Sequence, residues 1–272
     1  MESKILNRQI GLDSNYNIWH TNNSNMIIYM HSTGGSIVCN EKIYPIKEGA
    51  LCFIGAQKHH YTMPDDANTY VRSKVFASTD ELRKILSYFP QKETTAQIFS
   101  DESFVYAEIN EKDRSKVEAL FDEISLYVND TKYGQTVFFS CYTRLLIYIS
   151  QSMIDVTSLP HGFMNKAVEY INSNICNDIG IDNICEYTHM SKYHFCRTFK
   201  KATGLTVMEY ILKTRIVLAK DLLVRESVSI SDVSEQCGFS SISYFCRVFK
   251  QDTGLTPLQY RKRLNTVNST RA

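Results

Sequence analysis

The sequence lacks the run of about 18 or more apolar residues that a membrane-spanning helix needs, although 43% of its 272 residues are hydrophobic. We therefore expect no transmembrane segment. The first residues, Met1–Ile5, also lack the apolar stretch of a secretory signal peptide. The length suits two domains, and this hydrophobic fraction can bury a sizeable core. We expect a cytoplasmic protein that makes no contact with a membrane.

The eight cysteines include no Cys-x-x-Cys pair, and no Cys/His grouping has the spacing of a structural zinc site. We therefore expect neither a metal nor a cofactor. Without an export signal the thiols are expected to be reduced, and to act as small apolar core residues. They are Cys39, Cys52, Cys141, Cys176, Cys185, Cys196, Cys237 and Cys246.

The net charge of +1 conceals opposite balances in the two parts of the chain. Residues 1–159 contain 15 Lys and Arg against 19 Asp and Glu, a net of −4, and residues 160–272 contain 15 against 10, a net of +5. A basic C-terminal part suggests a polyanionic partner for that part alone. The alternative is an ordinary solvated helical surface, since many of these are basic.

Residues 16–109 have the pattern of short strands separated by turns. Met26–Met30 and Ser36–Cys39 flank a pair of glycines, which is typical of a hairpin. Tyr70–Phe76 is a further strand candidate. Several short strands with glycine turns predict a small barrel or sandwich, which we place at residues 1–110.

The hydrophobic period becomes helical after this domain. Apolar residues recur at helical spacing within 111–129 and again within 136–154. Two adjacent amphipathic helices, a unit at 111–156, would suit a dimer interface. Equally, both helices would suit packing on the barrel. Residues 157–163 have the composition of a linker.

The helical C-terminal part contains a repeat of 50 residues. Residues 195–210 and 245–260 are identical at 10 of 16 positions, which marks two copies of one structural unit. Upstream the match continues at an offset of 49, so one extra residue sits in the second turn. There Ile181, Ile184, Met190 and Ser191 pair with Ile230, Val233, Phe239 and Ser240.

Each copy predicts a short helix, a tight turn and a second helix. Two phenylalanines bury one face of the second helix, which starts at an N-capping serine and ends at a glycine; a threonine caps the next helix. Gly238 supplies a positive φ in the second turn. These residues are Phe195, Phe199, Ser191, Gly204 and Thr206, then Phe245, Phe249, Ser240, Gly254 and Thr256.

The outward faces of both second helices are polar and basic, which is typical of helix-turn-helix units that enter the major groove. Arg suits bidentate recognition of guanine, and Lys suits phosphates. A connecting helix at about 206–225 would hold the two units so that they enter successive major grooves, about 34 Å apart. The alternative is that Arg197 and Arg247 only form salt bridges on a helical bundle.

Residues 164–264 resemble the DNA-binding domain of the AraC/XylS family of bacterial regulators. The second copy carries the family signature from Gly238 to Lys250, followed by Gly254, Pro257 and Tyr260; the first copy is looser. The resemblance implies contact with double-stranded DNA and with RNA polymerase. Cysteine stands at 196 and 246, where polar residues are frequent. The implied base contacts are Tyr193, Cys196, Arg197, Ile242, Ser243 and Arg247, and the phosphate contacts are Lys200 and Lys250, with Lys201 beside them and nearby helix N-termini.

Residues 26–76 resemble the cupin-type, ligand-sensing barrel of many AraC-type regulators. His60 falls at the position of a cupin metal ligand, but the His-x-His motif and its Glu are missing, so we expect no metal site and no catalytic residues. His59 and His60 are expected at a strand end, with one ring packed and one solvated.

The strand at 70–76 offers a candidate ligand pocket. Alternation places Arg72 and Lys74 on one face, which is either solvated or turned into a cavity. In sugar-responsive relatives the positions matching His31, Tyr61, Arg72 and Lys74 line the ligand cavity. The resemblance then implies a basic cavity that favours an anionic small molecule.

The sequence thus predicts an α+β protein of two domains. A cupin-like β-barrel with a helical pair precedes an all-α domain at 164–264, with two helix-turn-helix units joined by a long helix and a tail at 265–272. The predicted function is a homodimeric, ligand-responsive, sequence-specific DNA-binding regulator, with activation of a nearby operon favoured over repression. Two alternatives remain: a ligand-independent regulator whose barrel is a dimerisation scaffold, and a cupin enzyme fused to a DNA-binding domain.

Overall fold

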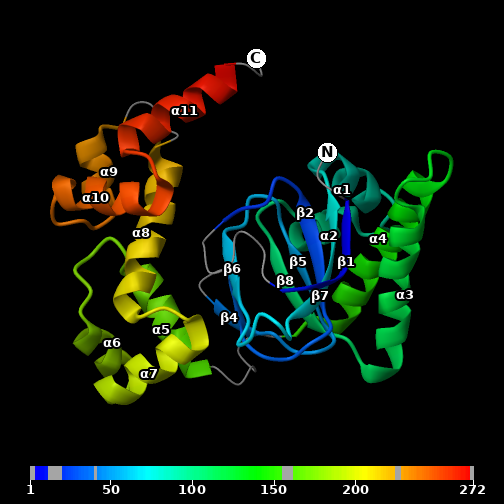
Figure 1. The fold of residues 1–272 in the computed structure, drawn as a ribbon, viewed down its shortest axis with the longest axis horizontal. Helices are drawn as coiled ribbons and strands as arrows, with labels where there is room; N and C mark the ends of the chain where they lie inside the picture. Colours follow the sequence, from blue (N-terminus) through cyan, green and yellow to red (C-terminus); the bar gives the residue numbers. More distant parts are fainter. Residues whose placement is uncertain (1–3, 12–19, 40–41, 155–161, 224–227, 270–272) are drawn as a thin grey trace. The chain divides into compact units, whose positions relative to one another are not determined.

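The computed structural model describes residues 4–11, 20–39, 42–154, 162–223 and 228–269. The chain divides into two compact units, Met1–Gly162 and Phe163–Ala272 (Figure 1), and each is described here by itself. The predicted linker lies mainly outside the described residues. Its last two residues already belong to helix α5 (Gly162–Ser173).

The described part of the N-terminal unit forms two antiparallel sheets. The large sheet has the strand order β1-β7-β2-β5-β8, and the small sheet has the order β4-β3-β6. The strands are β1 (Ile5–Ile10), β2 (Asn25–Met30), β3 (Ser36–Cys39), β4 (Lys42–Pro45), β5 (Ala50–Ile54), β6 (His60–Met63), β7 (Val71–Ala77) and β8 (Phe104–Glu108).

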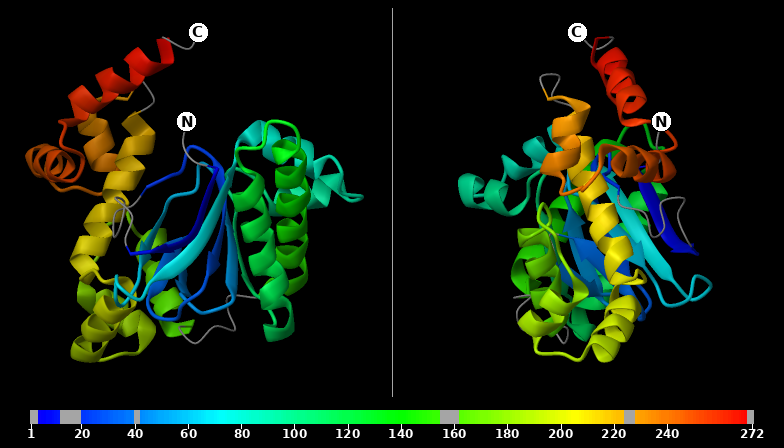
Figure 2. Two further views of the ribbon diagram at one scale, coloured as in Figure 1. Left: turned by 45° about the vertical axis from the view of Figure 1, so that its right-hand side comes forward. Right: turned by 90° about the vertical axis from the view of Figure 1, so that its left-hand side faces the viewer.

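Side chains alternate between the two faces of the large sheet. Ile27 and Val75 pack on one face in a buried cluster with the helices. Met26 and Ile28 point the other way, into a cluster that includes Ile37 of the small sheet. The large sheet therefore lies between a helical layer and the small sheet, as Figures 1 and 2 show. Burial on both faces explains why β2 is apolar along nearly its whole length.

The helical layer consists of α1 (Thr79–Leu86), α2 (Lys92–Ile98), α3 (Glu111–Tyr127) and α4 (Gly134–Ser152). Leu120 and Phe121 of α3, and Leu145 and Leu146 of α4, are at most 1% exposed within the cluster on the large sheet. The predicted helical pair therefore packs on the sheet, which was one of the two alternatives. The predicted dimer interface would then use the outer faces of α3 and α4.

The two sheets are not joined into a closed barrel in the part of the chain that the structure describes. They are held together by the side-chain cluster between them. The prediction of an α+β protein with two domains is confirmed. The described strands of the N-terminal domain form two packed antiparallel sheets, which was the sandwich alternative, and the cupin-like barrel is not confirmed. The physical reason is that apolar alternation specifies a buried face, but leaves open whether the edge strands pair.

The described part of the C-terminal unit is all helical, as predicted. A core cluster on α8 joins the second copy of the repeat through Ile216, Ala219, Leu223, Val233 and Phe245. Because α8 also contacts α7, one helix packs against both copies. With α5, the helices are α6 (Ile181–Thr188), α7 (Lys192–Thr203), α8 (Val207–Leu223), α9 (Ile230–Gln236), α10 (Ile242–Thr253) and α11 (Pro257–Ser269). Across the described ranges of the whole chain, no helix has the length and apolarity to span a membrane.

Candidate nucleic-acid interface

The two second helices of the repeat, α7 and α10, are equivalent residue by residue. The pattern of buried, intermediate and exposed residues over 191–200 is the same as over 241–250. In each copy the second phenylalanine meets a tyrosine of the following helix edge-on, with ring centroids 5.4 Å apart. The predicted inward residues, Phe195, Phe199, Phe245 and Phe249, have no exposed surface. The opposite faces of both helices are therefore presented in the same way.

The helix ends follow the predicted signals. Gly204 and Gly254 adopt φ of +69° and +75° at the ends of α7 and α10, where a residue without Cβ is favoured. Thr206 opens α8 through a reciprocal pair of hydrogen bonds with Glu209, and Thr256 opens α11 with Gln259 in the same manner.

The serine cap of the second copy requires a correction. Ser241, not Ser240, precedes α10, and its Oγ accepts a hydrogen bond from the Tyr244 backbone N–H at 3.2 Å. Ser191 holds the matching position before α7, without a side-chain capping bond. The extra residue of the second copy therefore lies between Gly238 and Ser241.

The tight turn of each copy needs one residue in the left-handed region. Gly238 supplies it in the second copy with φ of +75°, and His189 occupies the matching position in the first with φ of +55°. A non-glycine residue is strained there, so His189 keeps the turn at a free-energy cost. Sequence reasoning missed this position, although the offset of 49 between the two turns would have revealed it.

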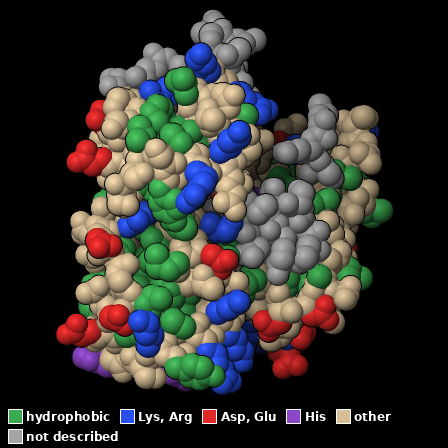
Figure 3. Space-filling model, turned by 60° about the vertical axis from the view of Figure 1, so that its left-hand side comes forward, with side chains coloured by type: hydrophobic (Ala, Val, Ile, Leu, Met, Phe, Trp, Pro, Cys, Tyr) green, Lys and Arg blue, Asp and Glu red, His purple; other side chains and the backbone are tan. Residues whose placement is uncertain are grey.

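The predicted DNA contacts lie on the outward faces of α7 and α10. Tyr193 and Ile242 are 78% and 45% exposed. Arg247 lies over the Tyr244 ring at 5.3 Å from its centroid, which directs the guanidinium along the helix surface. Figure 3 shows Lys and Arg side chains beside a strip of hydrophobic side chains on the C-terminal unit. Of the other predicted contacts, Arg197, Lys200, Lys201, Ser243 and Lys250 are exposed, and Cys196 is half-buried.

Two cationic side chains of α8 contact α10 and the loop after α5, and the sequence analysis did not identify them. Lys220 Nζ pairs with Asp252 of α10 at 3.0 Å. Arg215 donates to the carbonyls of Ile175 and Asn177 at 2.9 and 2.7 Å, and it caps the loop after α5. The sequence contained no signal for these pairs because their partners are 32 to 40 residues apart.

Arg72 and Lys74 share the face of β7 that points between the two sheets. They pair in register with Met30 and Ile28 of β2, which belong to the inter-sheet cluster. Arg72 has no exposed surface; it donates to the carbonyls of Gln9 and Gly11 and lies over the Tyr70 ring. The Arg72 side chain is therefore buried rather than solvated.

The other two predicted ligand residues lie elsewhere, which corrects the expected grouping. His31 contacts Ser73 and faces Glu118 of α3, on the helix-covered side of the large sheet. Tyr61 of β6 pairs with Val38 of β3. The preceding residue of β3, Ile37, faces the inter-sheet cluster. Alternation therefore places Tyr61 on the outer face of the small sheet.

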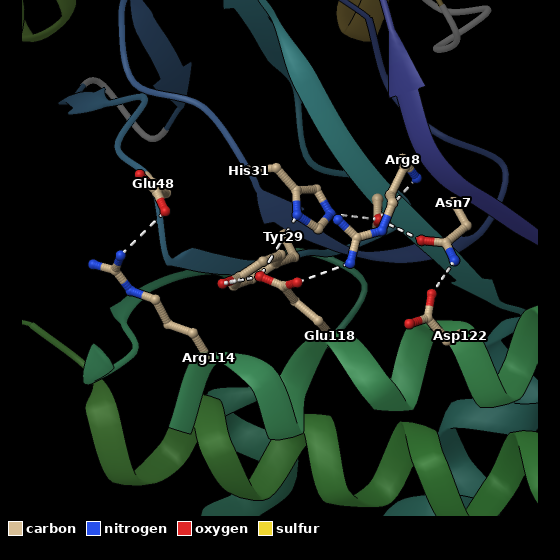
Figure 4. A network of polar contacts seen from close by, with 9 residues as sticks. Asn7, Arg8, Tyr29, His31, Glu48, Arg114, Glu118 and Asp122 are labelled. Carbon is tan, nitrogen blue, oxygen red and sulfur yellow. Dashed lines mark hydrogen bonds and ion pairs between the residues drawn. The ribbon is translucent and has the colours of Figure 1, made fainter. Parts of the chain in front are cut away.

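A polar network joins β1, the end of β2 and helix α3 (Figure 4). Its centre is Glu118, whose carboxylate accepts a hydrogen bond from Tyr29 Oη at 3.2 Å and pairs with Arg8 Nη2 at 2.8 Å. His31 Nδ1 lies 3.8 Å from the same carboxylate. Burial lowers the pKa of His31, although the Glu118 charge opposes this.

Ser73 forms the second junction of this network. Its Oγ donates to Asn7 Oδ1 at 2.7 Å, accepts from the Arg8 backbone N–H at 3.0 Å, and lies 2.8 Å from His31 Nε2. Arg8 reaches it at a bulge in β1, with φ of +47°. These contacts attach the first strand to the helix-covered face of the sheet.

His60 is buried at the start of β6, and its ring lies 4.4 Å from that of His20. Burial, with the neighbouring His20, lowers the pKa of His60 to about 3, so the ring is neutral at ordinary pH. Within the described ranges, no cluster of three or more His, Cys, Asp and Glu side chains is arranged to hold a metal ion.

Comparison with known proteins gives matches to transcription regulators. Residues 184–263 match a family described as a helix-turn-helix domain. The regulatory protein PocR of Salmonella typhimurium is 29% identical over 149 residues, which are 51% of this chain and 46% of PocR. The transcriptional activator RhaR of Mannheimia succiniciproducens is 24% identical over 239 residues, 83% of this chain and 80% of RhaR.

A solved transcriptional regulator from Chromobacterium violaceum, described as AraC-type, is 29% identical over 38% of this chain and 92% of that chain, with a TM-score of 0.36. The chain spans less than half the length of several curated relatives that it matches, PocR among them. The matched segment covers both copies of the repeat nearly completely. Residues 184–263 are therefore a helix-turn-helix domain that is similar to those of these transcription regulators.

Proposed function

We propose that this chain is a sequence-specific, DNA-binding transcription regulator. The observation that carries the proposal is the equivalence of α7 and α10, which present matching outward faces on one helical framework. In a helix-turn-helix unit the second helix enters the major groove. Two such helices in one domain suit an asymmetric site with two blocks of sequence.

Arg197 and Arg247 are the proposed base contacts of the two blocks, because each is exposed on the second turn of its helix and Arg reads guanine through two hydrogen bonds. Tyr193, Cys196, Ile242 and Ser243 complete the base-facing surface. Lys200, Lys201 and Lys250 follow toward the helix ends and are proposed to contact phosphates.

The N-terminal unit is proposed to be a cupin-like sensing domain for a small anionic effector. Arg72 and Lys74 place two cations on the face between the sheets, which favours a negatively charged ligand. An effector acts on DNA binding only if it has different affinities for two states of the protein. Homodimerisation through α3 and α4, contact with RNA polymerase, and activation rather than repression belong to the same proposal; a ligand-independent scaffold is the alternative.

The function is tested by selection of DNA from a random library with the full chain, at two salt concentrations. Two enriched blocks about one helical turn apart are expected, with Arg197→Ala relaxing one block and Arg247→Ala the other. Each substitution should weaken binding to its best site by about 1–3 kcal/mol. Binding that enriches no motif and only weakens with salt would refute the proposal, because electrostatic attraction alone behaves in that way.

The effector is tested separately by thermal unfolding of the full chain with a panel of small anionic metabolites. A bound effector should raise the unfolding temperature of the chain. Lys74→Ala should abolish that rise. If no compound in the panel stabilises the chain, that result would favour the ligand-independent alternative. It would not bear on the proposed DNA-binding function.

A further inference from the structure

The outward face of α7 borders an apolar groove with a volume of about 720 Å³. Ile181 from the start of α6 and Val207 and Met208 from the start of α8 form its walls, together with Tyr193 and Cys196 of α7. Lys192, Arg197 and Lys200 border the same groove. An apolar hollow bordered by cations therefore lies on the face that is proposed to meet the bases.

We propose that this groove receives the 5-methyl groups of thymine, and that Cys196 is a specificity-determining residue of the first helix-turn-helix unit. The inference rests on the proposed function. The methyl group of thymine is the apolar group that DNA presents on the edges of its bases in the major groove. An apolar surface on a recognition helix therefore discriminates thymine from the other three bases.

The position of the groove along α7 supports this assignment. Residues near the N-terminus of a recognition helix contact base edges, and Tyr193 and Cys196 lie in the first two turns of α7. The Cys196 side chain is small and apolar, with a weakly donating thiol, so it offers a methyl group contact rather than a hydrogen bond.

The charged residues at the groove favour DNA over an uncharged small molecule as the occupant. Lys192 is held to one side by Asp182, with 2.8 Å between Nζ and Oδ1. Arg197 and Lys200 lie on the following turn of the same face and are exposed. Cations that border an apolar surface are complementary to a base edge between two phosphate backbones.

The test uses the full chain and the best site from the random library. The block read by α7 is the one that Arg197→Ala relaxes. Each thymine in that block is replaced singly by deoxyuridine, which removes the methyl group and nothing else. At one or two positions we expect the dissociation constant to rise about three- to tenfold, the effect of losing one buried methyl contact.

The matched variants are Cys196→Ser and Cys246→Ser, at equivalent positions of the two copies. Cys196→Ser should reduce the ratio of dissociation constants for deoxyuridine and thymine sites to about one. Cys246→Ser should leave that ratio unchanged in the block read by α7. This comparison separates a local contact from a general effect of replacing a cysteine.

Two outcomes would overturn the groove assignment while leaving the proposed function intact. The block read by α7 would contain no thymine, or deoxyuridine would change binding by less than twofold at every position in it. Retention of the full ratio by Cys196→Ser would overturn the role of Cys196. Failure of the chain to enrich any motif would instead refute the proposed function, and this inference with it.

Discussion

Burial controls the ionisation of His60. Its folded pKa of about 3 lies below the ordinary value of 6.5, so above pH 6.5 both folded and unfolded chains hold a neutral ring. As the pH falls below 6.5, the unfolded chain takes up a proton that the folded chain does not. Stability should therefore decrease toward acid, by about 2 kcal/mol at pH 5 from this group.

Calorimetry of the N-terminal transition between pH 7.5 and 5 measures this dependence. His60→Gln should reduce the slope of stability against pH, whatever its effect on absolute stability. His194→Gln, which changes an exposed histidine in the other unit, should leave the slope unchanged. Equal slopes for His60→Gln and the parent chain would contradict the assignment.

Two glycines with the same backbone conformation provide a matched pair. Gly238 and Gly254 both have φ of +75°, but a Cβ at Gly238 would lie 2.8 Å from the carbonyl oxygens of Ile175 and Cys176, whereas none of the described atoms lies within 4 Å of a Cβ at Gly254. Gly254→Ala should cost about 1 kcal/mol, from the strained backbone alone.

Gly238→Ala should cost at least about 2 kcal/mol more, because two backbone carbonyls must move. Denaturant unfolding of both variants, followed through the helical signal, gives the difference. Equal costs would show that the loop at 175–176 yields freely to the added carbon. The positive φ at Gly238 was predictable from the turn pattern, but the close approach of residues 175–176 was not, since it is a contact between distant parts of the chain.

At the scale of elements, helix α3 is attached to the sheet by apolar packing and by Glu118. Removal of this carboxylate leaves Tyr29 and Arg8 without their acceptor. Glu118→Ala should therefore lower the free energy of unfolding of the N-terminal unit by about 1–2 kcal/mol.

Lys116→Ala is the control on the same helix. It removes the ion pair with Asp113, which lies one turn away on the same helix, so its effect on the free energy of unfolding should be much smaller than that of Glu118→Ala. Hydrogen exchange of β1 should also increase in Glu118→Ala, since Arg8 belongs to that strand. Unchanged hydrogen exchange in β1 would show that the polar network does not stabilise this strand.

At the scale of the whole molecule, the outer faces of α3 and α4 carry exposed apolar residues. Leu126 is 77% exposed and Ile147 is 40% exposed, while the inner faces of both helices are buried on the sheet. If the proposed homodimer uses these outer faces, burial of such side chains is what stabilises it.

Leu126→Glu should then weaken the dimer at least tenfold, as measured by sedimentation equilibrium of the full chain. Leu258→Glu changes a comparably exposed leucine of the C-terminal unit and should leave the self-association constant unchanged. A parent chain that sediments as a monomer at all concentrations would contradict the proposed dimer, and equal effects of the two variants would place the interface elsewhere.

Local sequence patterns predicted most of the secondary structure of the C-terminal domain. Its phenylalanine pairs, terminal glycines and capping threonines act through neighbours three or four residues away, so local periodicity and the repeat were sufficient to place α6 to α11 and their buried faces. The wrong cap at Ser240 followed from an alignment that assigned the extra residue one position too late.

Contacts between distant segments account for the features that local sequence patterns left open. Apolar alternation located the strands of the N-terminal unit, but the pairing of strands placed His31 and Arg72 on opposite faces of one sheet and left the two sheets open. The apolar groove at Cys196, with the cations that border it, likewise forms only where α6, α7 and α8 meet. A strand's period fixes which residues share a face, whereas long-range packing alone decides what that face meets.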